Sequence, residues 1–323
     1  MFKELKETYE NNIGKALEFK EMKNVQQLFL RECQRNILEA QDIKYLLVDS
    51  DVESLSYKKD GVYISLNENF NHMRLYIHDT DIDGAPMWLT CFGHYEAQET
   101  QMVKKILKQL PENSTVFDVG ANIGWYSIML KKCFPKLNVY SFEPAPENFH
   151  RLKRNFKLNN LDQNNLNNLG FYSEKGKIDF HFNPERTGAS SIKNILDQSF
   201  ETIQVDMDKM DLWVKNNAVK RLDFIKCDVE GAELFVYKGG IECIKTNKPV
   251  IMSEMLRKWS AKFNYHPNDI IQLFEEIGYE CYVIADNGML KRFGYVNEET
   301  IETNYFFLHP EVHNTIIQKL CAE

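Results

Sequence analysis

The pattern of hydrophobic and polar positions divides the chain into three stretches. Over roughly the first 40 residues, apolar side chains recur at helical spacing, which predicts two amphipathic helices. Short β-like runs follow at 45–48, 62–66 and 74–77. From about Tyr95 onward, apolar strand-like segments alternate with helical patterns, which is typical of a parallel sheet with helices between its strands.

The third stretch predicts the fold class. It contains seven candidate strands, so we expect an α/β fold with a doubly wound, mostly parallel seven-stranded sheet and a smaller α+β region before it. A boundary near residue 95 separates an N-terminal region, 1–94, from a main domain, 95–323. Because an exposed apolar helix face tends to mark an interface, the first region is a candidate for homodimer formation through its helices, or for a substrate cap. The candidate strands are 115–119, 138–143, 166–170, 222–227, 250–254, 280–285 and 305–308.

Charge and composition narrow the classes of partner. The chain has 323 residues with 39 basic and 47 acidic side chains, and its net charge of −8 lacks the electrostatic footprint that binds nucleic-acid backbones. No run approaches the roughly 18 apolar residues of a membrane helix. The charged start of the chain is unlike a signal peptide, and the seven cysteines are dispersed without a C-x-x-C pair. We therefore expect a cytoplasmic protein, without a membrane span, that acts on a small molecule.

The most informative segment is a glycine turn between a strand and a helix. An apolar strand ends at Asp118, and the chain turns through Gly120 and Gly124 before a helical pattern begins. Neither glycine has a Cβ to obstruct a ligand, and the helix start offers free amides. The G-x-x-x-G spacing differs from the G-x-G-x-x-G of dinucleotide folds. A carboxylate beside the turn also suits the cationic sulfonium and ammonium of S-adenosylmethionine (SAM) better than it suits a pyrophosphate.

Acids also end other strands of the predicted sheet. Glu143 ends the strand after the glycine turn, where an acid can accept hydrogen bonds from both hydroxyls of a ribose. Asp228 and Glu230 follow a later strand and lie two apart, so an extended backbone would place them on one side. Glu254 ends the next strand. We therefore expect three carboxylates to converge over the reacting centre, although helix capping by Asp228 or Glu230 is an alternative.

Four segments together resemble the FkbM family of SAM-dependent methyltransferases. They are 118–124, 143–144, 168–176 and 223–233, and the likeness covers roughly residues 95–310. The resemblance implies a Rossmann-like methyltransferase fold and O-methylation, often of sugars or polyketides. Cys227 stands where the family usually has an aliphatic residue.

The resemblance also implies roles for individual residues. Asn168 would lie near the adenine of SAM, and Glu96 is a further candidate SAM contact, because residues 94–96 resemble the family's approach to its first strand. Asp228 and Glu230 would line the active site. The residues implied to hold SAM are Asp118, Gly120, Asn122, Gly124 and Glu143.

Methylation of a hydroxyl oxygen requires that its proton be removed. The catalytic candidates are Asp228, Glu230 and Glu254, which fit a general base or a cluster that binds a hard cation such as Mg²⁺. The sequence does not decide between these roles. The expected acceptor is a sugar or nucleotide-linked sugar of surface-glycan biosynthesis.

Other features and two other functions carry less weight. The segment 79–84 resembles the start of a calcium loop but lacks its glutamate, and 257–259 is a candidate grip for a nucleotide-linked sugar. His181, in an expected hairpin at 177–182, and His266 are candidate substrate contacts. The alternatives are an NAD-dependent nucleotide-sugar oxidoreductase and a catalytically silent SAM-binding scaffold.

Overall fold

The described part of the chain falls into two compact units. The computed structural model describes residues 50–78, 81, 84–184, 186–194 and 201–321. One unit comprises Met1–Tyr95 with Pro184–Gly188, and the other Glu96–Asn183 with Ala189–Glu323. The predicted N-terminal helices, the run at 45–48 and the dimer surface assigned to those helices lie outside the described residues. A role of the first region in oligomerisation or substrate capping stays a prediction.

The first unit contains a small antiparallel sheet. Its strands are β1 (Val52–Lys58), β2 (Gly61–Leu66) and β3 (Arg74–Ile77), in that order, with a 3-10 turn at Glu68–Phe70 and helix α4 at Ala85–Phe92. β2 and β3 confirm the runs predicted at 62–66 and 74–77. The sequence pattern does not reveal β1, because a register shift between Val52 and Ser54 breaks its alternation of apolar and polar residues.

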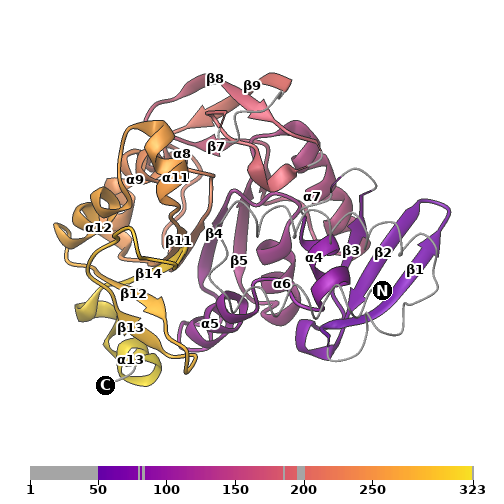
Figure 1. Cartoon of the computed structure of the whole chain (residues 1–323), viewed down its shortest axis with the longest axis horizontal. Helices are drawn as coiled ribbons and strands as arrows, with labels where there is room; N and C mark the ends of the chain where they lie inside the picture. Colours follow the sequence, from indigo (N-terminus) through magenta and orange to yellow (C-terminus); the bar gives the residue numbers. More distant parts are fainter. Residues whose placement is uncertain (1–49, 79–80, 82–83, 185, 195–200, 322–323) are drawn as a thin grey trace. The chain divides into compact units, whose positions relative to one another are not determined.

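The second unit is built on an eight-stranded sheet (Figure 1). Its strands are β4 (Thr115–Val119), β5 (Asn138–Phe142), β6 (Leu166–Asn167), β10 (Phe224–Cys227), β11 (Val250–Glu254), β12 (Glu280–Ile284), β13 (Leu290–Arg292) and β14 (Asn304–Leu308). They lie in the order β13-β12-β14-β11-β10-β4-β5-β6. Neighbours from β11 to β6 are parallel, whereas β14 is antiparallel to both neighbours and β13 to β12. The predicted mostly parallel α/β sheet is confirmed, but it has β13 in addition to the seven expected strands.

The prediction of one strand at 166–170 is wrong. That segment forms β6 at the edge of the large sheet and a separate strand, β7 (Gly170–Phe171), in a second sheet of order β7-β9-β8. The change of sheet separates the two strands at Asn168, whose side chain is tied to the loop after β5. An apolar run by itself does not show that its strand is split in this way.

Strand β9 (Glu201–Asp208) is absent from the prediction. It pairs antiparallel with β8 (Gly176–Phe182), so residues 177–182 form one strand of a pair rather than a hairpin of their own. In β9 the buried or half-buried Ile203, Val205 and Met207 alternate with polar residues. Such alternation is typical of a half-solvated antiparallel strand, and it lacks the continuous apolar run by which buried parallel strands are recognised.

Helices cover both faces of the large sheet (Figure 1). Every residue of β4 is buried, as expected for a central strand packed on both sides. On one face Phe117 packs against Trp213 of α8, with ring centroids 5.5 Å apart, in a core that also includes apolar side chains of α9, α10 and α12. The helices are α5 (Ala97–Leu107), α6 (Trp125–Cys133), α7 (Pro146–Leu158), α8 (Met210–Asn216), α9 (Glu233–Gly239), α10 (Ile241–Asn247), α11 (Arg257–Ser260), α12 (Pro267–Glu275) and α13 (Pro310–Leu320).

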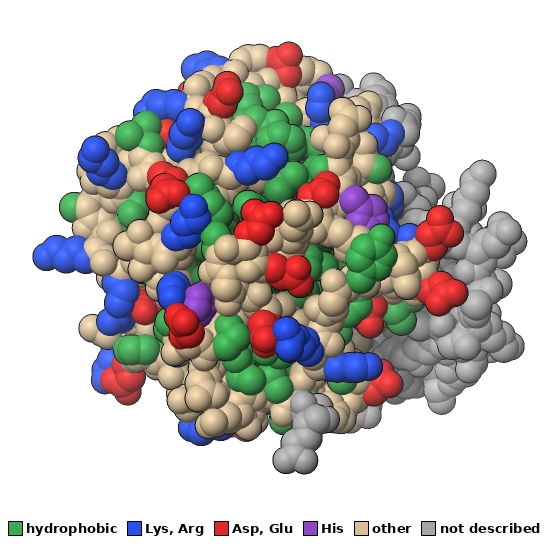
Figure 2. Space-filling view, turned by 90° about the vertical axis from the view of Figure 1, so that its left-hand side faces the viewer, with side chains coloured by type: hydrophobic (Ala, Val, Ile, Leu, Met, Phe, Trp, Pro, Cys, Tyr) green, Lys and Arg blue, Asp and Glu red, His purple; other side chains and the backbone are tan. Residues whose placement is uncertain are grey.

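The described surface carries charges of both signs. On the face shown in Figure 2, acidic and basic side chains are interspersed among small apolar patches, and no continuous basic tract crosses the described residues of this face. Within the described ranges, no helix is both long enough and apolar enough to cross a membrane.

Candidate active site

The glycine turn joins β4 to α6 and is pressed against the neighbouring strands. Gly120 and Gly124 have φ of +77° and +96°, in the left-handed region that favours glycine. A Cβ on Gly120 would lie 1.8 Å from the carbonyl oxygen of Asp228. The amides of Gly120 and Ala121 both donate to the carbonyl of Phe142, at 3.0 Å. The turn therefore takes a single tight course, and the helix predicted after it is α6, which begins at Trp125.

Asp118 lies beneath this turn and is fully buried. Its Oδ2 accepts hydrogen bonds from the backbone amide, at 3.0 Å, and the hydroxyl of Ser127 in α6. Its Oδ1 lies 3.9 Å from the ammonium of Lys226 and has no hydrogen-bond partner among the described residues. Burial raises the pKa of Asp118. The carboxylate therefore holds the helix start and faces a protein ammonium, rather than lying open beside the turn.

Glu143 follows β5 and faces the glycine turn. One carboxylate oxygen accepts from the amide of Asn122 at 2.8 Å, and the other from the amide of Ala145 at 3.0 Å. Burial raises the pKa of Glu143 to about 7. Asn168 donates from Nδ2 to the carbonyls of Glu143 and Pro144, at 2.9 and 3.0 Å, and so fixes the loop that presents the acid.

Asn122 has a feature that points to a ligand. Its φ is +48°, and its buried Oδ1 has no hydrogen-bond partner among the described residues. Buried polar atoms are nearly always paired, so this oxygen is suited to accept from a bound molecule. It lies beside the acid Glu143, so the two side chains together are suited to a ligand that carries hydroxyl groups.

Three carboxylates converge at the ends of β10 and β11. One ligand-type oxygen from each of Asp228, Glu230 and Glu254 lies within 4.8 Å of the others. The convergence agrees with the sequence expectation, but its cause is different. Glu230 is not in extended backbone; it has a φ of +55° in a tight turn, where its carbonyl accepts from the hydroxyl of Ser191 at 2.8 Å.

The turn that carries these acids is held by a fourth carboxylate. Glu233, at the start of α9, accepts from the amides of Val229 and Gly231 at 3.1 and 3.0 Å. The hydroxyl of Tyr265 donates to its other oxygen at 3.1 Å. No described side chain caps the start of α9, so the helix-capping alternative for Asp228 or Glu230 is wrong, and both acids belong to the cluster.

Two acids of the cluster have raised pKa values. Burial, followed by the negative charge of Asp228, raises the pKa of both Glu230 and Glu254 well above its usual range. Both causes disfavour the charged form of a carboxylate. Glu230 and Glu254 therefore bind a proton more readily than an ordinary carboxylate does.

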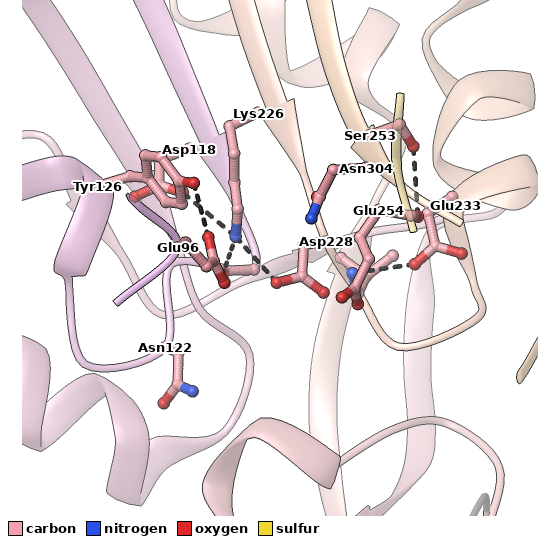
Figure 3. A network of polar contacts seen from close by, with 12 residues as sticks. Glu96, Asp118, Asn122, Tyr126, Lys226, Asp228, Glu233, Ser253, Glu254 and Asn304 are labelled. Atoms are coloured by element: carbon pink, nitrogen blue, oxygen red, sulfur yellow. Dashed lines mark hydrogen bonds and ion pairs between the residues drawn. The ribbon is translucent and has the colours of Figure 1, made fainter. Parts of the chain in front are cut away.

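Lys226 is a site residue that the sequence reading missed. It lies in the middle of β10 and is only 6% exposed. Its ammonium donates to the carbonyl of Gly120 at 3.1 Å and to Asp228 at 3.2 Å (Figure 3). Burial acts to lower the pKa of Lys226, but nearby carboxylates, led by Asp228, outweigh it and raise the pKa. The available signal was a charged residue within an apolar strand, which is rare unless the charge is paired.

Glu96 lies on the side of the Lys226 ammonium opposite Asp228 (Figure 3). It precedes α5 with a φ of +43°, and its carboxylate accepts from the hydroxyl of Tyr126 at 2.6 Å. Burial raises the pKa of Glu96 to about 7. The structure thus brings Glu96, Asp118 and Asp228 around one ammonium. Glu143 instead contacts the glycine turn at Asn122, and Asn168 contacts the backbone of Glu143.

The remaining candidates have other local roles. His266 accepts from the amide of Asn268 at 3.3 Å and forms a capping box with Asp269 at the start of α12. His181 lies in β8 and exchanges backbone hydrogen bonds with Ser191. Arg257 donates to the carbonyl of Glu298 at 2.9 Å. Part of the segment 79–84 lies outside the described residues; its Asp81 accepts from the hydroxyl of Thr187 at 2.8 Å.

Comparison with known proteins gives a consistent family. The profile of the methyltransferase FkbM domain matches residues 118–281. Methyltransferase 1 of Beauveria bassiana is 29% identical over 147 residues, which is 40% of this chain and 59% of that protein.

Two further relatives have more specific names. The hexuronic acid methyltransferase AglP of Haloferax volcanii is 26% identical over 179 residues, covering 55% of this chain and 68% of that protein. The 2-O-methyltransferase NoeI of Sinorhizobium fredii is 29% identical over 143 residues, covering 40% and 58%. The chain therefore spans less than two thirds of the length of two of these three curated relatives.

Proposed function

The chain belongs to the FkbM family of methyltransferases, and from this premise we propose that it is an enzyme that transfers a methyl group from SAM to a hydroxyl oxygen. The observation that carries the proposal is the cluster of Asp228, Glu230 and Glu254 beside the glycine turn. The turn is suited to a nucleoside ligand, and the cluster is suited to receive the proton that a hydroxyl must lose.

The residues proposed to hold SAM lie on both sides of the glycine turn. Gly120 and Gly124 allow the tight, left-handed course of the turn, and the unpaired Oδ1 of Asn122 can accept from a ribose hydroxyl. Glu143 lies next to it, and Asn168 keeps the acid's loop in place. Asp118 acts indirectly, because it pairs with Lys226 and holds the first turn of α6 through the amide of Ser127.

The chemical step asks little of the protein beyond alignment and proton removal. When bound, SAM supplies a methyl carbon that bonds to the acceptor oxygen as its bond to sulfur breaks, and S-adenosylhomocysteine (SAH) remains. Much of the acceleration comes from holding the reactants in line. A carboxylate of the cluster accepts the hydroxyl proton, and the raised pKa values of Glu230 and Glu254 make them stronger bases than an ordinary carboxylate.

A hydroxyl of a sugar, free or nucleotide-linked, is the acceptor we propose. The support is that two relatives are named as a hexuronic acid methyltransferase and a 2-O-methyltransferase. A sugar hydroxyl is a weak acid, which agrees with a site that gathers three carboxylates. We propose surface-glycan biosynthesis as the setting of this reaction.

Isothermal titration of SAH into the full-length protein tests the cofactor, with and without Mg²⁺. We expect binding at about micromolar affinity or tighter. A marked gain in affinity with Mg²⁺ would assign the acidic cluster to a cation that acidifies the hydroxyl, whereas equal affinity favours a side-chain base. No binding in either condition would refute the proposal and return the NAD-dependent oxidoreductase to consideration.

Substitution of Glu230 tests the chemistry. We expect Glu230→Gln to keep SAH affinity within about threefold and to lower methyl transfer at least 100-fold, because the amide cannot take the proton. Transfer is followed as SAH release with a panel of sugars and nucleotide sugars that includes hexuronic acids. The matched control is Glu275→Gln, an exposed acid of α12. Wild-type rates in Glu230→Gln would remove this residue from catalysis, and SAH binding without turnover on any acceptor would favour the silent scaffold.

A further inference from the structure

The side chain of Lys226 connects three elements. Its ammonium donates to the carbonyl of Gly120 in the glycine turn and to the carboxylate of Asp228 after β10. It lies 3.9 Å from Asp118 in β4 and 5.4 Å from the ring centroid of Tyr126 in α6. The two hydrogen bonds thus reach one group on the proposed cofactor side and one on the proposed acceptor side.

Burial of an ammonium in a central strand needs a reason. Taking such a charge out of water costs several kcal/mol, and replacement of a buried ion pair by apolar residues is often neutral or stabilising. Neutralising Asp118 is one reason, but that contact is the longest of the three ionic or hydrogen-bonded contacts. The shorter contacts, at 3.1 and 3.2 Å, go to Gly120 and Asp228.

The backbone around Lys226 strengthens this link. The carbonyl of Asp228 lies so close to Gly120 that no side chain fits there, and the amide of Asp228 donates to the carbonyl of Val119 at 3.1 Å. The main-chain contacts therefore fix the position of the Asp228 backbone, and the hydrogen bond from the ammonium fixes the position of its carboxylate. In Figure 3, Asp228 lies between Lys226 and Glu254.

We propose that Lys226 is a positioning residue that fixes the carboxylate of Asp228 relative to the glycine turn, so that the cofactor and acceptor sites keep one separation. The inference rests on the proposed function. Because reacting atoms must approach to within about 3–3.5 Å, a displacement of about 1 Å between the two sites is enough to lower the rate strongly.

A double-mutant cycle on SAH affinity tests the link without requiring the acceptor. The full-length wild type, Lys226→Met, Asp228→Asn and the double variant are titrated with SAH by calorimetry. We expect each single change to weaken SAH binding about five- to tenfold, and the double variant to be no weaker than the worse single one. If the fold loss of SAH affinity in the double variant equals the product of the two single losses, the residues act independently and the proposal is overturned.

A second cycle serves as the matched control. It pairs Lys226→Met with Glu254→Gln, a change in the same acidic cluster on the far side of Asp228. We expect the fold loss of SAH affinity in this double variant to be the product of the two single losses. Coupling as strong as that with Asp228 would mean that Lys226 acts on the whole cluster through charge rather than by positioning one carboxylate, and would also overturn the proposal.

A further set of variants controls for a loss of folding. If thermal melts show that Lys226→Met does not fold, the cycle is repeated with Asp118→Asn present in all four proteins, which removes the buried charge opposite the lost ammonium. The coupling between positions 226 and 228 is expected to persist there. Independent effects, or a failure to fold even in that background, would show that Lys226 is purely structural. Absence of SAH binding by the wild type would instead refute the proposed function itself.

Discussion

At the scale of single residues, three side chains of the candidate site extend from backbone conformations that L-residues rarely adopt. Glu96, Asn122 and Glu230 have φ of +43°, +48° and +55°. Such conformations cost about 1–3 kcal/mol each and persist where the surroundings over-determine them. Here the Tyr126 hydroxyl holds Glu96, and the Ser191 hydroxyl holds the carbonyl of Glu230. The fold therefore imposes the directions in which these side chains point.

Gly120→Ala tests the tightest point of the site. The added Cβ would clash with the Asp228 carbonyl, and φ of +77° is unfavourable for alanine. We expect the free energy of unfolding to fall by at least about 2 kcal/mol and SAH affinity to fall more than about 100-fold. Urea titration and calorimetry measure the two effects.

Gly176→Ala is the matched control for that change. Gly176 lies in β8, and a Cβ there would meet no atom within 4 Å. We expect stability and SAH affinity close to those of the wild type. Equal behaviour of the two alanine variants would contradict the tight approach of the glycine turn to Asp228.

At the scale of elements, loops are fixed by side chains of the neighbouring helices. Glu233 at the start of α9 holds the turn that carries Asp228 and Glu230. Asn155 of α7 donates to the carbonyl of Ile123 in the glycine turn at 2.9 Å. Unpaired amides and carbonyls at loop ends are costly when buried, so these contacts stabilise one loop course each.

His266→Ala tests the start of α12. The histidine forms a capping box with Asp269, so its loss should lower the free energy of unfolding by about 0.5–2 kcal/mol. SAH affinity should not change, because the residue acts on its own helix. Urea titration and calorimetry check this; a loss of SAH binding with unchanged stability would restore His266 as a candidate ligand contact.

At the scale of the whole domain, sheet order gathers the site. β5, β4, β10 and β11 are consecutive parallel strands, so their carboxyl ends meet along one edge. Open α/β sheets bind ligands at that edge. The acids at these strand ends, Asp118, Glu143, Asp228 and Glu254, are therefore brought into one region although up to 136 positions separate them, from 118 to 254.

The buried glutamates of this domain predict how the free energy of unfolding depends on pH. Burial raises the pKa of Glu96, Glu143 and Glu233 from 4.5 to about 7. Such groups contribute stability that is fully present below the unfolded pKa and is lost as the pH rises through the folded one. We therefore expect the urea midpoint of the ligand-free protein to fall between about pH 5 and about pH 8.

Two histidines oppose this trend, and one variant tests the origin of the trend. Burial lowers the pKa of His309, and it lowers that of His313 from 6.5 to about 4. The contribution of His313 is therefore present above 6.5 and lost as the pH falls through about 4. Three acids outweigh two histidines over this window. Glu96→Gln should reduce the pH dependence, because one titrating group is removed while an acceptor remains for the Tyr126 hydroxyl. A urea midpoint that rises with pH would contradict the prediction.

Most of the fold class and much of the candidate site are determined by the sequence itself. Continuous apolar runs and helical periods identify β4, β5, β10 and β11, since buried parallel strands and amphipathic helices leave local patterns. The same local order places an acid at each strand end and glycines in the turn. Local residues also mark two helix starts, since Gly124 directly precedes α6 and Pro146 is the first residue of α7.

Only the tertiary structure decided how those parts meet. The split of 166–170 between two sheets, the pairing of β9 and the extra edge strand β13 depend on partners distant in the sequence. The same holds for Asp118, which faces an ammonium, and for Glu230, whose left-handed backbone turns it toward Glu254. The role of Lys226 is the clearest case, because the pairing of β4 with β10 brings Asp118 beside it and the segment before α5 adds Glu96. Burial and charge pairing arise from non-local packing, so no local pattern specifies them.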